Sequence, residues 1–130
     1  MPHVAALYAA LLLAVFLALS ARVLRRRFAA RIPLGTGGDR ALERAARVHA
    51  NFAEYAPVFL AALVAAELCG APGGALHAAG LAMLAGRVMH GLGMSREPDI
   101  LPLRAGGMVL TLLALVLAAA LALGGGLRLW

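Results

Sequence analysis

The sequence has little of what a soluble domain depends on. Charged residues make up only 14% of its 130 residues and aromatic residues 5%, and it has no lysine, so all twelve basic residues are arginines. The single cysteine, Cys69, excludes a disulfide within the chain. What is abundant is apolar: 63% of the residues are hydrophobic and the mean hydropathy is +0.88. These values exclude an ordinary soluble globular domain and indicate an integral membrane protein.

The formal net charge of +6 reflects membrane topology and not a nucleic-acid partner. Basic and aromatic residues do not interleave as they do in nucleic-acid-binding surfaces, and we therefore expect no nucleic acid among the partners. Most of the arginines lie between the first two apolar segments, where topology signals are found. These are Arg22, Arg25, Arg26, Arg27, Arg31, Arg40, Arg44 and Arg47.

Four apolar segments are long enough to cross a membrane. No charged side chain occurs between Met1 and Ala21, and 21 helical residues rise about 31 Å, which matches the hydrocarbon core of a bilayer. Turn-forming residues at 70–74 and a polar run at 95–99 separate the later segments. The sequence therefore predicts one all-α domain over 1–130, a bundle of four transmembrane helices spanning 4–24, 44–69, 75–94 and 103–123.

The arginine-rich connection between the first two spans sets the orientation, because the 70–74 hairpin carries no charge. Both termini are then predicted on the non-cytoplasmic side. The end of the first span, the start of the second, the end of the third and the start of the fourth meet at the cytoplasmic face. The polar residues that can converge there are Arg25 to Arg27, Arg47, Asn51, Arg87, His90 and Arg104.

Residues 43–57 place a polar seam on an otherwise apolar helix. At about 100° per residue, Arg47, Asn51 and Glu54 fall on one stripe, with Tyr55 at its edge. An ionised side chain that faces lipid costs about 2.5 to 3.5 kcal/mol, so Glu54 is expected to face protein or water. Pro57 is expected to kink the helix near this seam.

The seam allows two interpretations. Its three residues could neutralise one another in a polar clasp that fixes helix packing. Alternatively, because Arg44, Arg47 and Asn51 offer more donors than Glu54 can accept, they could bind a small polyanion whose free amine pairs with Glu54. Glu67 and His49 lie on the opposite side of the helix and receive no role.

Arg87 and His90, at i and i+3 on the third span, present two ionisable groups in one direction. Arg104 opens the fourth span, where the helix dipole disfavours a cation, so it is either a topology signal or an anion-binding residue. In a dry site its guanidinium would favour a bound thiolate over the thiol, which activates a nucleophile without a base.

The motifs Arg47-x-x-x-Asn51-x-x-Glu54-Tyr55-x-Pro57 and Gly86-Arg87-x-x-His90, followed by Arg104, resemble those of the membrane-associated proteins in eicosanoid and glutathione metabolism, the MAPEG family. The resemblance covers essentially the whole chain. It implies a homotrimer of four-helix subunits that binds glutathione between neighbouring subunits, near the cytoplasmic side. It also implies a multi-pass protein of a bacterial inner membrane.

By this resemblance, the glutathione ligands are predicted to be Arg47, Asn51, Glu54, Tyr55, Arg87 and His90, and Arg104 is predicted to stabilise the thiolate. An arginine at the end of the first span, Arg26 or Arg27, contributes in some members, and Arg27 is taken as the candidate. Met94 stands where several members carry a tyrosine. No metal site is expected.

The predicted function is therefore that of a glutathione-dependent transferase or peroxidase acting on lipophilic electrophiles from the bilayer. Two alternatives remain open at this point. Four spans and one embedded carboxylate also describe a small proton-coupled exporter that uses Glu54, and the seam could equally belong to a non-catalytic membrane scaffold.

Overall fold

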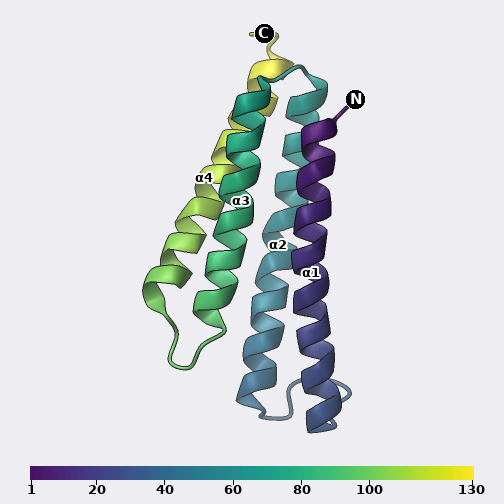
Figure 1. The fold of residues 1–130 in the computed structure, drawn as a ribbon, viewed down its shortest axis with the longest axis vertical. Helices are drawn as coiled ribbons and strands as arrows, with labels where there is room; N and C mark the ends of the chain where they lie inside the picture. The colour runs from purple at the N-terminus through teal and green to yellow at the C-terminus, as the bar shows by residue number, and fades with distance from the viewer.

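The computed structural model describes all 130 residues and contains four helices and no strand (Figure 1). The helices run antiparallel to their chain neighbours, and both termini lie at one end of the bundle (Figure 1). This confirms the predicted four-helix class. The elements are α1 (His3–Ala30), α2 (Arg40–Leu68), α3 (Gly73–Met94) and α4 (Leu101–Gly126).

The arginine-rich ends of α1 and α2 extend beyond the predicted spans. Asp39 caps α2 by accepting a 2.7 Å hydrogen bond from the backbone N–H of Leu42, so the helix begins at Arg40. That bond, together with the nearby Arg26 guanidinium, holds the pKa of Asp39 below its ordinary value. At about 1.5 Å per residue α1 is about 42 Å long. Both helices therefore project past the α3–α4 connection at this end (Figure 1).

Helices α1, α2 and α4 are long and apolar enough to cross a membrane by length and composition. Helix α3 has 22 residues, enough for about 33 Å, but glycine, histidine and arginine lower its hydropathy. Two of its ionisable side chains point inward: Arg87 is 3% exposed and His90 7% exposed. A third, His77, is exposed near the start of the helix. Thus α3 spans the bundle while Arg87 and His90 stay out of the lipid.

Glycines let α3 and α4 approach closely. A Cβ on Gly107 would lie 2.6 Å from the carbonyl oxygen of Gly86, and a Cβ on Gly93 would lie 2.9 Å from the Cα of Arg104. No side chain fits at either position without displacing backbone. This contact sets the first turns of α4 directly against the last turns of α3.

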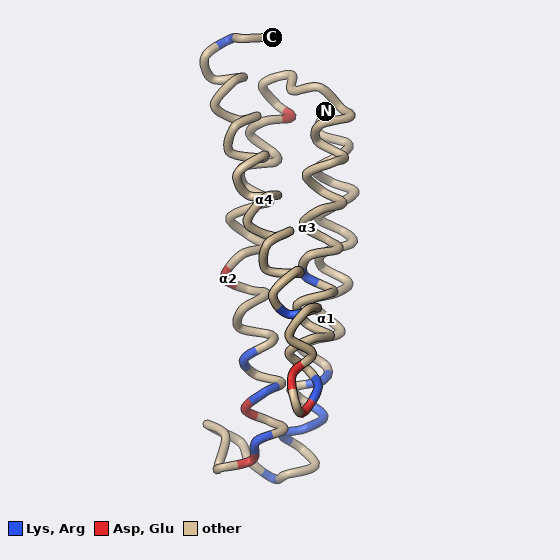
Figure 2. The backbone as a smooth tube through the Cα atoms, turned by 90° about the vertical axis from the view of Figure 1, so that its left-hand side faces the viewer, with Lys and Arg blue, Asp and Glu red and all other residues tan.

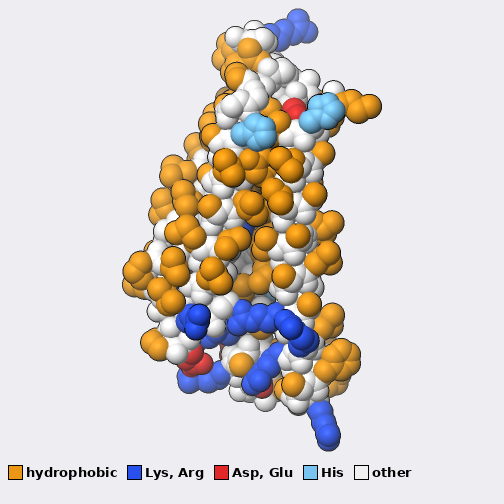
Figure 3. Space-filling view, in the orientation of Figure 1, with side chains coloured by type: hydrophobic (Ala, Val, Ile, Leu, Met, Phe, Trp, Pro, Cys, Tyr) orange, Lys and Arg blue, Asp and Glu red, His pale blue; other side chains and the backbone are white.

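The remaining surface divides along the length of the bundle. Hydrophobic side chains cover the middle of the molecule, and arginines gather towards the end remote from the termini (Figure 3). The backbone view shows the same concentration of basic and acidic positions in that half, with one basic and one acidic position near the end that holds the termini (Figure 2). A broad apolar belt with a charged end is the surface that a bilayer requires.

Candidate functional site

Helices α2, α3 and α4 line an open polar hollow of about 340 Å³ in the arginine-rich half. Five of the predicted site residues line it, and three of them come from the α2 seam. A volume of this size lies at the lower end of the range for small-molecule sites. The lining residues are Arg47, Ala50, Asn51, Glu54, His90, Met94 and Arg104.

Arg104 is the common element of this hollow and two neighbouring ones. Towards the outer end, a second hollow of about 290 Å³ shares Arg47, Met94 and Arg104 with the first. A third, of about 490 Å³, shares Asn51, His90 and Arg104. The three hollows therefore adjoin one another at Arg104, and the third is half apolar, with Leu101, Ala105 and Met108 in its lining.

The α3–α4 connection is bound to this surface through Asp99. Its carboxylate accepts hydrogen bonds from Arg44 and, at 2.5 Å, from Arg104. Partial burial acts to raise the pKa of Asp99, but the hydrogen bonds and charges of Arg104 and Arg44 outweigh it, and the pKa lies below its ordinary value. Arg44, predicted as a surplus donor, is thus already paired. The Arg104 guanidinium, which has five N–H groups, keeps others free.

The sequence analysis did not identify Asp99 as a site residue, because it treated residues 95–99 only as a polar connection. The available signal was an acid five residues before Arg104, in a connection too short to move far from either helix end. Pairing it with Arg44, more than fifty residues away, required the helix arrangement.

His90 presents an unpaired ring nitrogen at the wall of the hollow. Its Nδ1 lies 3.0 Å from the backbone carbonyl oxygen of Arg104. Because a carbonyl oxygen only accepts, Nδ1 carries the proton, and in the neutral ring Nε2 is then an acceptor. Nε2 is buried and has no hydrogen-bond partner. A buried nitrogen without a partner, on a residue that lines the hollow, is uncommon in a region that serves packing alone.

Arg87 and Tyr55 lie behind the hollow and do not line it. The buried Arg87 guanidinium donates to Asn51 Oδ1 at 2.7 Å and to Thr111 Oγ1 at 2.9 Å, and it stacks 5.2 Å from the centre of the Tyr55 ring. A single chain therefore does not bring these two predicted ligands to the wall of the hollow. Because its oxygen is engaged by Arg87, Asn51 is left with its amide NH₂ as the free donor.

The first-span arginines do not reach the hollow within one chain. Arg27 donates to the carbonyl oxygens of Ile32, at 3.4 Å, and Gly35, at 2.8 Å, and Arg26 forms a 3.0 Å ion pair with Asp39. The long α1 carries both beyond the level of the α2 seam, which the predicted span boundaries did not anticipate.

The polar clasp does not form. No hydrogen bond or ion pair joins Arg47, Asn51 and Glu54, and neither Arg47 nor Glu54 has any partner in the chain. Both residues are exposed at the open hollow. Two unpaired charges within a membrane helix need a ligand, water or a neighbouring subunit.

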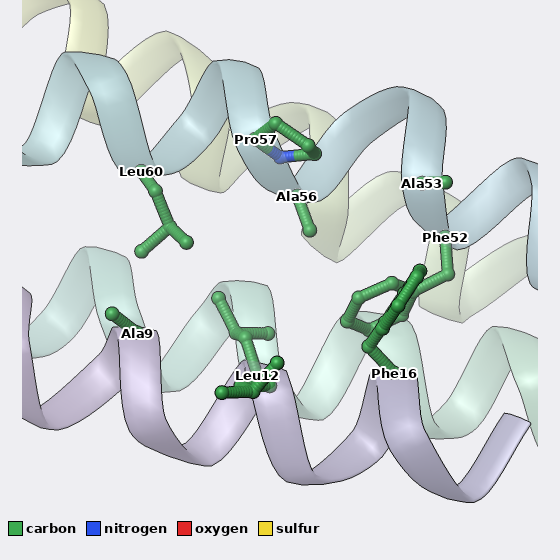
Figure 4. Close-up of a pocket in the computed structure, with 9 residues that line it drawn as sticks. Ala9, Leu12, Phe16, Phe52, Ala53, Ala56, Pro57 and Leu60 are labelled. Carbon is green, nitrogen blue, oxygen red and sulfur yellow. The ribbon is translucent and has the colours of Figure 1, made fainter. Parts of the chain in front are cut away.

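A separate apolar groove of about 520 Å³ lies between α1 and α2. Figure 4 shows Leu12 and Phe16 of α1 facing Phe52, Ala56 and Leu60 of α2 across it. Helix α2 continues through Pro57, which also lines the groove. The complete lining is Ala9, Leu12, Leu13, Phe16, Phe52, Ala53, Ala56, Pro57 and Leu60.

Comparison with known proteins agrees with this architecture. The sequence model of the MAPEG family matches residues 5–124. The chain is also 36% identical over 114 residues to the inner membrane protein YecN of Escherichia coli strain K12, an alignment that covers 88% of this chain and 86% of YecN. YecN of Escherichia coli O6:H1 matches with the same values. The chain is therefore a multi-pass integral membrane protein and belongs to the MAPEG family.

Proposed function

We propose that this protein is a membrane-bound glutathione-dependent transferase or peroxidase that acts on lipophilic electrophiles. The observation that carries the proposal is the charge pattern of the α2–α3–α4 hollow, where Arg47 and Arg104 accompany a single carboxylate, Glu54. Glutathione carries one ammonium group, two carboxylates and a thiol. Glu54 complements the ammonium, and the cations complement the anionic groups.

Arg47, Asn51 and His90 bind glutathione, and Arg104 activates its thiol. Arg47, which has no partner within the chain, is free to bind a glutathione carboxylate with its guanidinium fork. The amide NH₂ of Asn51 can donate to a peptide carbonyl, and Nε2 of His90 can accept from a peptide N–H. These contacts fix the tripeptide with its thiol towards Arg104.

Arg104 supplies the chemistry. Its guanidinium stabilises the thiolate, so the sulfhydryl proton leaves to solvent at neutral pH. The thiolate then forms a bond to carbon of an electrophile with loss of the leaving group. With a hydroperoxide it instead bonds to the terminal oxygen while the O–O bond breaks and the alkoxide leaves as the alcohol; the resulting glutathione sulfenic acid reacts with a second glutathione to give the disulfide and water. The apolar groove between α1 and α2 can hold a lipophilic co-substrate that arrives from the bilayer.

The exposed charges on α2 also support assembly. Arg47 and Glu54 are exposed in a single chain, where contact with lipid is costly. A homotrimer that binds glutathione between neighbouring subunits would cover them, and it would let a neighbour supply Arg26 or Arg27. The concentration of arginines at this end supports a cytoplasmic site with both termini on the other side of the inner membrane.

The test compares glutathione binding with conjugation of an aryl halide in the purified protein. Wild type should bind glutathione with a submillimolar Kd by titration calorimetry. Arg104→Gln should lower conjugation by about 10²-fold or more, because it removes a charge that acts on the reacting sulfur, while binding falls far less. Arg128→Gln, at the opposite end of the bundle, is the matched control and should change neither value.

Two results would redirect the proposal. If glutathione binds but neither wild type nor Arg104→Gln conjugates any electrophile, the site is a binding site without this activity. If glutathione does not bind at all, the proposal falls.

The unpaired state of Glu54 keeps the exporter alternative open, since no cation in the chain forms an ion pair with this carboxylate. Proton flux in proteoliposomes that depends on a substrate and disappears in Glu54→Gln would favour the exporter. Unchanged glutathione affinity in Arg47→Ala would favour the scaffold.

A further inference from the structure

A second charged hollow, separate from the glutathione site, lies at the arginine-rich end of α1. It has a volume of about 420 Å³. Its wall combines arginines with apolar side chains from the last turns of α1 and the segment that follows. The lining residues are Leu24, Arg27, Phe28, Arg31, Ile32 and Pro33.

The arginines here lack acidic partners. Arg25, Arg27 and Arg31 form no ion pair, in contrast to Arg26, which pairs with Asp39. Arg27 donates only to two backbone carbonyl oxygens, so its charge stays uncompensated. These bonds also tie the chain after α1 back onto the helix, and they thereby shape the hollow.

The apolar side chains of the hollow are unusually open. The Phe28 side chain is 80% exposed and Leu24 is 54% exposed. Leu24 and Phe28 lie four residues apart, so they share one side of the helix. Arg31 follows the last helical residue and lines the same hollow. An exposed aromatic ring and a leucine next to unpaired cations make an amphipathic surface. Exposing its apolar part to water is unfavourable.

The position of this surface along α1 indicates which part of the bilayer it meets. Helix α1 is about 42 Å long, which exceeds a hydrocarbon core of about 30 Å, so its last turns reach the headgroup layer. At that level a ligand that presents a negative phosphate above an acyl chain matches the cations and the apolar residues together. A second copy of the chain that met itself here would place arginines opposite arginines.

We propose that this hollow is a binding site for an anionic phospholipid. The lipid phosphate binds between the Arg27 and Arg31 guanidinium groups, with Arg25 adding charge nearby, and one acyl chain lies along Leu24 and Phe28. The two hollows share no lining residue, and Arg31, unlike Arg27, has no place in the glutathione proposal.

The experiment counts bound lipids by native mass spectrometry in an uncharged detergent. Wild type is titrated with phosphatidylglycerol or with phosphatidylcholine of the same chains. The test variant is Arg27→Gln with Arg31→Asn: Gln keeps a donor for the carbonyls, and Asn tolerates the positive φ of 55° at position 31. Arg128→Asn is the matched control, because Arg128 has the same backbone conformation, φ 57°, at the far end.

Wild type and Arg128→Asn should prefer phosphatidylglycerol by about tenfold or more, since each cation near the surface contributes roughly 1 kcal/mol. The double variant should lose this preference, and Phe28→Ser should weaken the binding of both lipids. Equal binding of the two lipids to wild type would overturn the proposal. So would an undiminished preference in the double variant, or complete displacement by inorganic phosphate, which would leave a simple anion site.

Discussion

Helix α2 carries two carboxylates along its membrane-spanning length, and the structure treats them in opposite ways. Both Glu67 oxygens are used: they accept the backbone N–H groups of Val4 and Ala5 at 2.8 and 2.7 Å. Glu54, thirteen residues earlier, is exposed and has no partner. The same residue type on one helix is thus a closed structural contact near the termini and an open group in the arginine-rich half.

The polar groups around Glu67 and around Glu54 differ in the same way. Near the termini, the buried Tyr8 hydroxyl donates to the carbonyl oxygen of His77 at 3.1 Å, so the polar groups there satisfy one another. In the other half, the buried Nε2 of His90 has no partner and Arg47 is free. Unsatisfied polar groups in a membrane protein are costly. Their accumulation at one end is what distinguishes a binding site from packing.

The largest effect should come from the closed carboxylate. Pro2 provides no side-chain cap for α1, and Glu67 replaces that cap from another helix. Glu67→Gln leaves one acceptor and turns an amide donor towards a backbone donor, so it should cost about 1.5 to 3 kcal/mol of unfolding free energy. Denaturation in mixed micelles measures this loss. Glutathione affinity should not change, and a loss of affinity without loss of stability would contradict the division of roles.

Glu54→Gln should show the reverse. The amide cannot form an ion pair with the ammonium group of glutathione, so the affinity should fall by about tenfold, equivalent to ~1.4 kcal/mol. Stability should stay the same, because Glu54 makes no contact within the chain. Calorimetric titration gives the affinity, and S-methylglutathione, which keeps the amine and carboxylates, should show the same loss. The contradicting result uses an analogue of glutathione that lacks the amine. If Glu54→Gln weakens the binding of this analogue as much as it weakens the binding of glutathione, Glu54 does not bind the ammonium group.

The sequence predicted the membrane fold well because the dominant forces are local to each segment. Apolar length fixed the four helices, and the arginine distribution placed their polar ends together. Helix periodicity brought Arg47, Asn51 and Glu54 to one stripe. The order of the spans predicted that His90 and Arg104 would converge with them, and both line the same hollow. These predictions required only the spacing of residues and the order of the spans.

What the sequence could not predict depends on contacts between distant segments. Asp99 and Thr111 looked ordinary, yet one pairs with Arg44 and Arg104 and the other receives a bond from Arg87. Glu67 could not be recognised as a cap, because the N–H groups that it accepts belong to another helix. Periodicity gives the side of a helix on which a residue lies, but it does not identify the partner that faces it.

The smallest effect, and the finest test of the open half, concerns Asp99. Its carboxylate holds Arg104 and Arg44 and so competes with an anionic ligand for the same cations. Asp99→Asn should therefore raise glutathione affinity at pH 7, by about threefold, as expected for an accessible ion pair.

Asp99→Asn should also destabilise the protein slightly, because the pKa of Asp99 is lowered in the folded state. The stability that the ionised carboxylate contributes is fully present above the unfolded pKa of about 3.9 and is lost as the pH falls through the lower folded value. The stability difference between wild type and variant should thus persist at neutral pH and disappear in acid. A fall in glutathione affinity would instead make Asp99 a positioning residue for Arg104, and the open half would then contain one closed contact on which its function depends.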